Sequence, residues 1–174
     1  MRVLVVAATE KELGGHRGLV CGVGPVEAAA ATARALAERR PDGLLHVGVA
    51  GSRGLPELAL VLGSEAVWED PDAPFVPSRA LPDAALLERL RAAFPAALVR
   101  PIGTSARVGG TATCEVEAME GFAVLRAAEL AAVPAVEARV VANEIDEPDR
   151  GRWRLEDAFA RLQELLPELV RAVS

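Results

Sequence analysis

The sequence contains no tyrosine, and aromatic residues make up only 3% of its 174 residues. The core must therefore be built from alanine, valine and leucine, because the large rings that often fill cores are nearly missing. Hydrophobic residues still account for 51% and charged residues for 25%, which is typical of a soluble globular protein. A chain of this length most simply forms one domain, and we predict a single domain over residues 1–174.

Basic runs and long apolar runs are also missing. The net charge is −6, which argues against a nucleic-acid groove or an anionic membrane surface as a partner. No apolar run reaches the roughly 20 residues that cross a bilayer, and the apolar run at the N-terminus is too short for a signal peptide. We therefore expect a cytoplasmic protein that does not contact a membrane.

Cysteine is scarce, since the chain has only Cys21 and Cys114. Their spacing matches neither a metal site nor a secreted disulfide framework, so we expect reduced thiols. His16 and His46 have no evident ligand set, and His46 falls in an apolar strand, where a core role fits best. The sequence thus predicts no metal and no cofactor.

Strand and helix patterns alternate along the chain. Strands are predicted at residues 2–8, 18–25, 44–51, 64–68, 97–104 and 134–142, and helices at 26–40, 83–93, 115–132 and 153–173. This alternation predicts an α/β fold, with a largely parallel or mixed central sheet covered by helices on both faces in three layers. In such sheets, ligands bind beyond the carboxyl ends of the strands.

Candidate functional residues follow the first and third of these strands. Glu10 and Glu12 come after the first strand, where either can act as a general base or can simply open a short helix. The small residues Val49, Ala50 and Gly51 end the third strand. They allow a ligand to approach the backbone closely, or they form only a tight turn.

Asn143 follows the strand at 134–142. Its amide both donates and accepts hydrogen bonds, so it can bind O6 and N7 of a purine together. Asparagine also suits a loop turn, which is the simpler explanation.

Glu120 lies in an apolar segment that predicts a helix. At about 100° per residue, Glu120 is only about 40° from the centre of an apolar stripe formed by Val116, Met119, Ala123, Ala127 and Leu130. A carboxylate in this position must be paired, hydrogen-bonded or facing a cavity, where it can accept from two adjacent ribose hydroxyls. The alternative is a solvated acid near the start of the helix.

Five stretches, in this order, resemble the nucleoside phosphorylase and nucleosidase superfamily: VVAATEKEL, CGVGPVEAAAATARAL, LHVGVAGSRGL, VEAMEGFAV and VEARVVANEID. They are similar to the family's acidic turn, its Gly-x-Gly turn, its Gly-x-Ala-Gly strand end, its ribose-binding Met-Glu signature and its base-recognition strand. The resemblance covers most of the chain and implies the nucleoside phosphorylase-like α/β/α fold.

The resemblance also implies roles for individual residues. By its register, Glu12 rather than Glu10 orients and deprotonates the attacking water. Met119 packs against the ribose and Glu120 holds its 2′- and 3′-hydroxyls. The backbone of Val49–Gly51 lines the cavity, and the partner is a small-molecule nucleoside.

The ending ANEIDEPDRGRW resembles the futalosine hydrolases, which split hypoxanthine from futalosine in a menaquinone pathway. Methylthioadenosine/S-adenosylhomocysteine nucleosidases usually carry Ser-Asp where this chain has Ala142-Asn143. Aspartate can protonate N7 of adenine, whereas an asparagine amide fits a 6-oxopurine such as hypoxanthine. Phosphorylases of the superfamily place an arginine where this chain has His46, so a phosphate dianion would be poorly held. We therefore expect hydrolysis of a 6-oxopurine nucleoside, with futalosine as the first candidate.

Three alternatives stay open. The chain can be a methylthioadenosine/S-adenosylhomocysteine nucleosidase, a purine nucleoside phosphorylase, or a non-catalytic nucleotide-binding α/β domain. The short segment after Leu13 favours the last, because the family usually has a longer hairpin there. A neighbouring subunit can complete such a pocket, so the resemblance implies a homo-oligomer, a dimer or larger. Arg53, Arg107 and Arg139 are all candidates to bind a substrate carboxylate.

Overall fold

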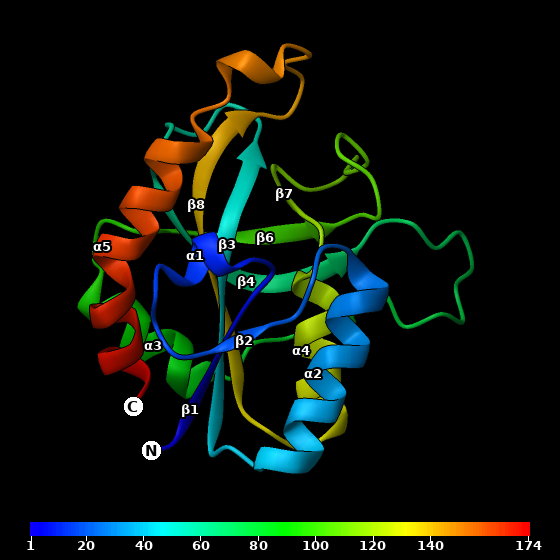
Figure 1. Ribbon diagram of the computed structural model, residues 1–174. Helices are drawn as coiled ribbons and strands as arrows, with labels where there is room; N and C mark the ends of the chain where they lie inside the picture. The colour runs from blue at the N-terminus through cyan, green and yellow to red at the C-terminus, as the bar shows by residue number, and fades with distance from the viewer.

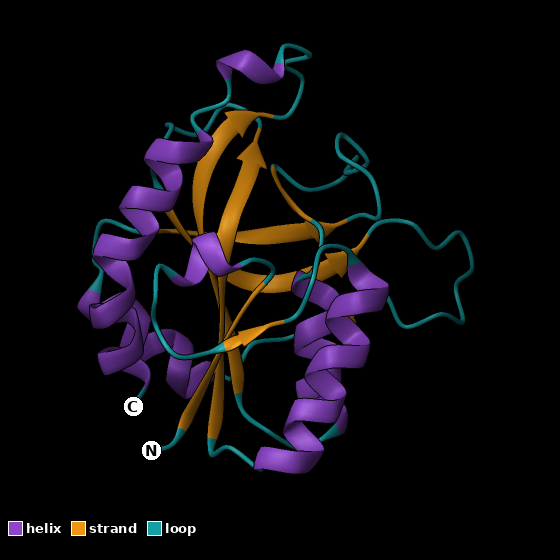
Figure 2. Ribbon diagram, viewed as in Figure 1, coloured by secondary structure: helices purple, strands orange, loops and turns teal.

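The computed structural model describes residues 1–174, with one eight-stranded sheet that carries helices on both faces (Figures 1 and 2). The elements in chain order are β1 (Val3–Ala7), α1 (Glu10–Leu13), β2 (Leu19–Val20), α2 (Pro25–Arg39), β3 (Gly43–Ser52), β4 (Leu60–Trp68), β5 (Arg79–Ala80), α3 (Ala84–Ala93), β6 (Leu98–Thr104), β7 (Val116–Ala118), α4 (Gly121–Leu130), β8 (Ala135–Glu144), the 3₁₀ turn η1 (Arg150–Arg152) and α5 (Leu155–Val173).

The sheet is mixed, and part of it closes on itself. Strands β1, β2, β3 and β8 are parallel where they pair, whereas β3–β7, β4–β5 and β4–β8 are antiparallel. Each strand in the series β3, β8, β4, β6 and β7 pairs with the next, and β7 pairs back to β3. These five strands therefore form a small barrel. Their shared apolar cluster is Ala50, Val61, Ile102, Val116, Ala118 and Val141.

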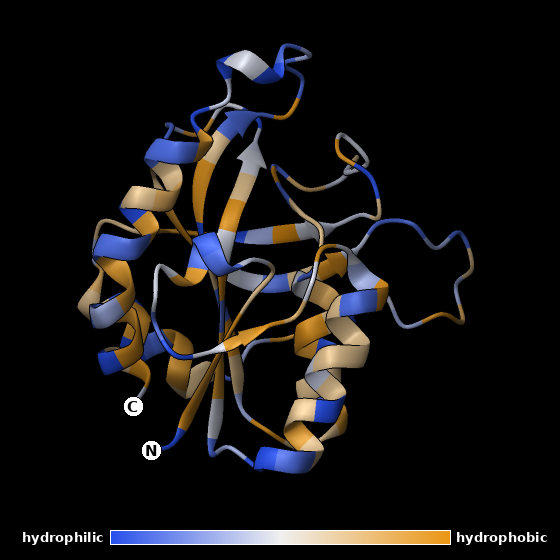
Figure 3. Cartoon of the chain, viewed as in Figure 1, coloured by the Kyte–Doolittle hydropathy of each residue, from blue (hydrophilic) through white to orange (hydrophobic).

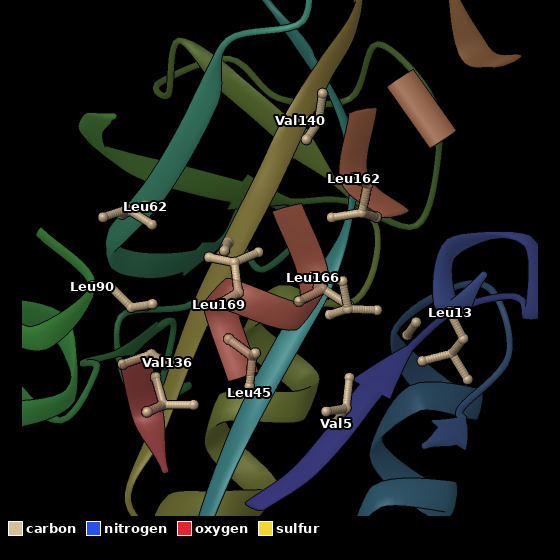
Figure 4. Packing of buried hydrophobic residues seen from close by; sticks show 14 of the residues in the cluster. Val5, Leu13, Leu45, Leu62, Leu90, Val136, Val140, Leu162, Leu166 and Leu169 are labelled. Carbon is tan, nitrogen blue, oxygen red and sulfur yellow. The ribbon is translucent and has the colours of Figure 1, made fainter. Parts of the chain in front are cut away.

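Helices α3 and α5 cover one face of the sheet, and α2 and α4 cover the other (Figure 1). On α5, the residues Ala158, Leu162, Leu166, Leu169 and Val173 are buried, which is the spacing of one helical face. They pack on strand residues such as Leu45 and Val136 (Figure 4). Leucine, valine and alanine dominate both clusters, as the shortage of aromatic residues requires.

The second face contains a stacked pair of aromatic rings. Trp68, at the end of β4, stacks on Phe122 of α4 with 5.5 Å between ring centroids and 18° between ring planes. Hydrophilic residues predominate in η1 and in much of the protruding loop between β4 and β5 (Figure 3). None of the helices is both long and apolar enough to cross a bilayer.

The predicted α/β class with a mixed sheet and helices on both faces is confirmed. The helix predicted over residues 115–132 is wrong in its first part. Val116–Ala118 forms β7, which pairs with both β3 and β6. Pairing with these distant strands outweighs the helix propensity of the Glu and Ala residues in the segment. The helix begins at Gly121, and Leu130, expected on the buried stripe, is 73% exposed.

Other boundaries also differ from the prediction. Strand β4 begins at Leu60 instead of residue 64, and β8 continues through Asn143 to Glu144 where a loop was expected. The closing helix begins at Leu155, two residues later than predicted. Of the strand predicted at 18–25, only Leu19–Val20 pairs with β1. The two-residue β5 and the four-residue α1 are too short for a periodic pattern to reveal.

Candidate active site

A cavity of about 340 Å³ lies at the carboxyl ends of β1, β3 and β8. This volume is at the lower end of the range for small-molecule sites. All seven residues predicted for the site line it, namely Glu12, Val49, Ala50, Gly51, Met119, Glu120 and Asn143. The remaining lining residues are Ala8, Thr9, Val23, Val108, Glu117, Ala118, Trp153, Leu155 and Phe159.

Glu12 is fixed in the cavity by three hydrogen bonds. One carboxylate oxygen accepts from Val49 N at 3.1 Å, and the other accepts from Thr9 N and Thr9 Oγ1 at 2.9 and 3.0 Å. Thr9 and Glu12 thereby form a capping box on α1. Burial is the largest influence and raises the pKa of Glu12 above its ordinary 4.5, although Arg139 and Val49 oppose the shift. A carboxylate with a raised pKa is suited to accept a proton at neutral pH. Glu10 is exposed.

Glu120 is also buried, but not for the reason that the sequence suggested. It is separated from β7 by Met119 alone and occupies the N-cap position of α4, so it has no place on a helical stripe. One carboxylate oxygen accepts from Gly24 N at 3.1 Å, and the other lies 3.5 Å from Arg139 Nη2. The Gly-x-Gly turn before α2 therefore orients this carboxylate. Glu120 as a whole residue is only 4% exposed.

Asn143 reaches the cavity through an irregularity in β8. Ala50 pairs with Val141 and Gly51 pairs with Asn143, so Ala142 is an extra residue in the ladder. Such bulges re-aim nearby side chains. Asn143 Nδ2 donates to Glu144 O at 3.0 Å and would lie 3.0 Å from a Cβ placed on Gly51. The second N–H and Oδ1 of this amide have no partner in the chain and can serve a ligand.

Arg139 is the buried cation beneath the cavity, and nothing in its spacing from the predicted site residues distinguishes it from the other arginines. Its Nε donates to Glu137 Oε1 at 2.8 Å, and its Nη1 donates to Val49 O at 3.4 Å. Its Nη2 lies 3.1 Å from His46 Nε2. Glu137 and Arg139 are two residues apart on β8 and therefore share a face. The sequence signal for this buried ion pair was therefore two opposite charges, two residues apart, in an otherwise apolar predicted strand.

The charges beneath the cavity are unequal in number. Burial, followed by the charge of Arg139, lowers the pKa of His46 well below 6.5, so the ring is neutral. Burial raises the pKa of Glu137 more than Arg139 lowers it, and Glu137 Oε2 has no hydrogen-bond partner. The one guanidinium, that of Arg139, thus interacts electrostatically with three carboxylates, those of Glu137, Glu120 and Glu12.

Gly48 makes this arrangement possible. A Cβ at this position would overlap Arg139 Nη1 and would lie only 2.6 Å from Glu12 Oε1. The backbone of β3 can approach both charged groups because no side chain intervenes.

The three candidate arginines for a substrate carboxylate have different surroundings. Arg139 is committed to the buried network. Arg53 pairs with Asp146 at 3.2 Å and donates to the carbonyl oxygens of Thr111 and Cys114. The guanidinium of Arg107 makes no hydrogen bond or ion pair in the chain.

The remaining wall of the cavity is apolar. Trp153, Leu155 and Phe159, from the start of α5 and the residues before it, form this wall, and Trp153 Nε1 donates to Glu147 O at 3.3 Å. Both cysteines are free and buried. Burial is the main cause that raises the pKa of Cys21 to about 12 and that of Cys114 to about 11, so neither thiol is an effective nucleophile at neutral pH.

Comparisons with known proteins agree with this architecture. The family model of the phosphorylase superfamily matches residues 12–174. A futalosine hydrolase from Streptomyces coelicolor is 33% identical over 183 aligned positions, which cover 87% of this chain and 77% of the relative.

Two solved structures illustrate the likeness in fold. The 5′-methylthioadenosine/S-adenosylhomocysteine nucleosidase of Colwellia psychrerythraea, in complex with adenine, has a TM-score of 0.87 at 19% identity, covering 99% of this chain and 96% of that one. A futalosine hydrolase mutant of Helicobacter pylori has a TM-score of 0.86 at 16% identity, covering 97% of this chain and 98% of that one. Sequence and fold together show that the chain belongs to the phosphorylase superfamily.

Proposed function

We propose that this chain hydrolyses the N-glycosidic bond of a 6-oxopurine nucleoside, with futalosine as the substrate and hypoxanthine as the released base. The relatives of this chain are N-glycosyl hydrolases, and the chain is a nucleosidase of this type. The observation that carries the proposal is the convergence of Glu12, Glu120 and Asn143 in one cavity.

Each of these side chains has a chemical task in the proposed reaction. The bond between C1′ and the purine nitrogen breaks with its electron pair moving to the base, which leaves a cationic ribosyl centre. Glu120 accepts hydrogen bonds from the two ribose hydroxyls, and its charge favours the developing cation. Met119 packs beside the sugar.

Glu12 activates the nucleophile. A water molecule bonds to C1′ through its oxygen and gives a proton to the Glu12 carboxylate, whose raised pKa favours this transfer. Asn143 stabilises the departing base, because its free N–H can donate to O6 while Oδ1 accepts from N7–H, once N7 has taken a proton from solvent.

The charge of the cavity supports water rather than phosphate as the nucleophile. Three glutamates line it, namely Glu12, Glu117 and Glu120, and no lysine or arginine does. A phosphate dianion would meet like charges without a cation to bind it. Arg139 lies below and is already engaged by Glu120 and Glu137.

The direct test is incubation of the protein with futalosine, with and without inorganic phosphate, followed by chromatography. We expect hypoxanthine and the free ribosyl product at the same rate in both. A phosphate-dependent ribose 1-phosphate product would instead indicate a phosphorylase. Preferred release of adenine from methylthioadenosine would indicate the other nucleosidase class, and no release from any nucleoside would indicate a binding domain.

Asn143→Asp is expected to reverse the base preference. The acid can protonate N7 of adenine but loses the N–H that donates to O6, so kcat/KM for futalosine should fall by about 100-fold, since a buried polar partner is left unmatched. Hydrolysis of methylthioadenosine should rise in the same variant. The neighbouring Glu144→Gln, at an exposed position, is the control and should leave the ratio of the two activities unchanged. An unchanged ratio in Asn143→Asp would contradict the role of this amide.

A further inference from the structure

The loop between β6 and β7, residues 105–115, has no regular structure, but carboxylates from outside the loop hold its backbone at both ends. At one end, Asp70 accepts from Ala106 N at 2.9 Å. At the other, Glu69 accepts from the backbone N–H of Thr113 at 3.3 Å and of Cys114 at 3.1 Å. The 105–115 loop is therefore a fixed part of the fold, because its donors are satisfied by charged acceptors.

Glu117 holds the middle of the same loop. Its Oε1 accepts from Gly109 N at 2.6 Å, and its Oε2 accepts from Thr111 N at 2.8 Å. Both oxygens of this carboxylate are thus occupied by the loop backbone, although Glu117 lines the cavity and is 6% exposed. Because its side-chain hydrogen bonds all go to the loop backbone, Glu117 supports the structure of the loop.

The loop segment that Glu117 fixes is the part that reaches the cavity. Val108 is the only residue of the 105–115 loop among the lining residues, and it directly precedes Gly109. Val108 is 45% exposed without a ligand, so its side chain has surface to bury against one.

The register of the sheet places this segment near the base. Gly51 pairs with Glu117 on one side and with Asn143 on the other. Residues directly opposite one another in a ladder share a face, so Glu117 and Asn143 flank the same glycine on the cavity face. The 105–115 loop therefore stands at the end of the cavity where Asn143 is proposed to bind the purine.

We propose that Glu117 is a positioning residue, which holds the 105–115 loop so that Val108 closes over the base. The inference rests on the proposed function only in placing the base beside Asn143. Glu117 acts on substrate binding through the loop, and it leaves the reacting atoms to Glu12 and Glu120.

Glu117→Gln tests the proposal, because the amide replaces one acceptor by a donor that opposes a backbone N–H. We expect KM for futalosine to rise about 10-fold and kcat to change by less than about 3-fold, as loss of one to two charge-assisted hydrogen bonds implies. Hydrogen exchange in peptides covering residues 105–115 should become faster in the ligand-free variant. Glu69→Gln is the matched control. It loosens residues 112–114, which do not line the cavity, and KM should stay within about 2-fold of wild type.

Val108→Ala covers the case in which Glu117→Gln does not fold, since it shortens the closing side chain without touching β7. It should raise KM with little change in kcat. Unchanged KM in Val108→Ala, or unchanged KM and exchange in a folded Glu117→Gln, would overturn the proposal. Hypoxanthine alone is the second probe. If it slows exchange in the wild-type loop but not in Glu117→Gln, the positioning role stands even where no nucleoside is hydrolysed and the proposed function fails.

Discussion

Glu12→Gln is expected to lower kcat for futalosine hydrolysis by about 1,000-fold, within the range for removal of a general base. The amide cannot take a proton from water, whereas it can still accept the hydrogen bond from Val49 N that orients the side chain. Binding of hypoxanthine should therefore persist. Hypoxanthine release measured by chromatography, together with calorimetric titration of the base, would separate the two effects.

The pH profile gives this prediction a second measurement. A general base works when it is deprotonated, so wild-type kcat/KM should fall as the pH is lowered through the pKa of Glu12. Because burial raises this pKa above its ordinary 4.5, the fall should begin at a higher pH than for an exposed glutamate. The residual activity of Glu12→Gln should lack this acid limb. Glu10→Gln, two residues away on the exposed side of α1, should keep wild-type activity and the limb. Turnover by Glu12→Gln at the wild-type rate would refute the assignment.

Arg139→Met is expected to destabilise the protein by about 3–5 kcal/mol, the usual effect of removing one partner from a buried ion pair. Methionine fills a similar volume, but Glu137 and Glu120 lose the guanidinium at 2.8 and 3.5 Å. For a chain of this size, Tm should fall by roughly 10 °C. Thermal unfolding followed by circular dichroism would measure it.

Arg126→Met is the matched control, because Arg126 forms an i,i+3 pair with Glu129 on the accessible side of α4. Its free energy of unfolding should change by less than about 1 kcal/mol. Combining Arg139→Met with Glu137→Gln should recover part of the lost stability, since the second change removes an unpaired buried charge. Equal and small effects of the two arginine replacements would show that the buried network contributes little.

The strands and helices that are long and strongly patterned could be predicted from the sequence. The apolar run of β1 and the alanine-rich α2 lie close to their expected positions. The Glu120 prediction gave the right burial from a wrong conformation, because β7 exists only through pairing with two distant strands. Local periodicity contains no information about such partners.

The convergence of the predicted site residues in one cavity could be expected from the sequence, whereas the contacts that support them could not. Glu12 follows the end of β1 and Asn143 lies near the end of β8, so the topology of the sheet brings them near one another. The placement of one guanidinium near three carboxylates depends on how β3 and β8 pair. The need for glycine at position 48 follows only from the position of Arg139 beside it, which the sequence does not give. The 105–115 loop depends on acids as distant in sequence as Glu69.

The lack of tyrosine has an optical consequence, because phenylalanine emits only weakly and nearly all ultraviolet fluorescence of this protein must come from two indoles. One of them, Trp153, lines the cavity, while Trp68 stacks on Phe122 beneath a different surface. A Trp68→Phe protein would therefore keep Trp153 as its single indole fluorophore, at the wall of the cavity. Its quenching on titration would report cavity occupancy in unlabelled protein and in real time.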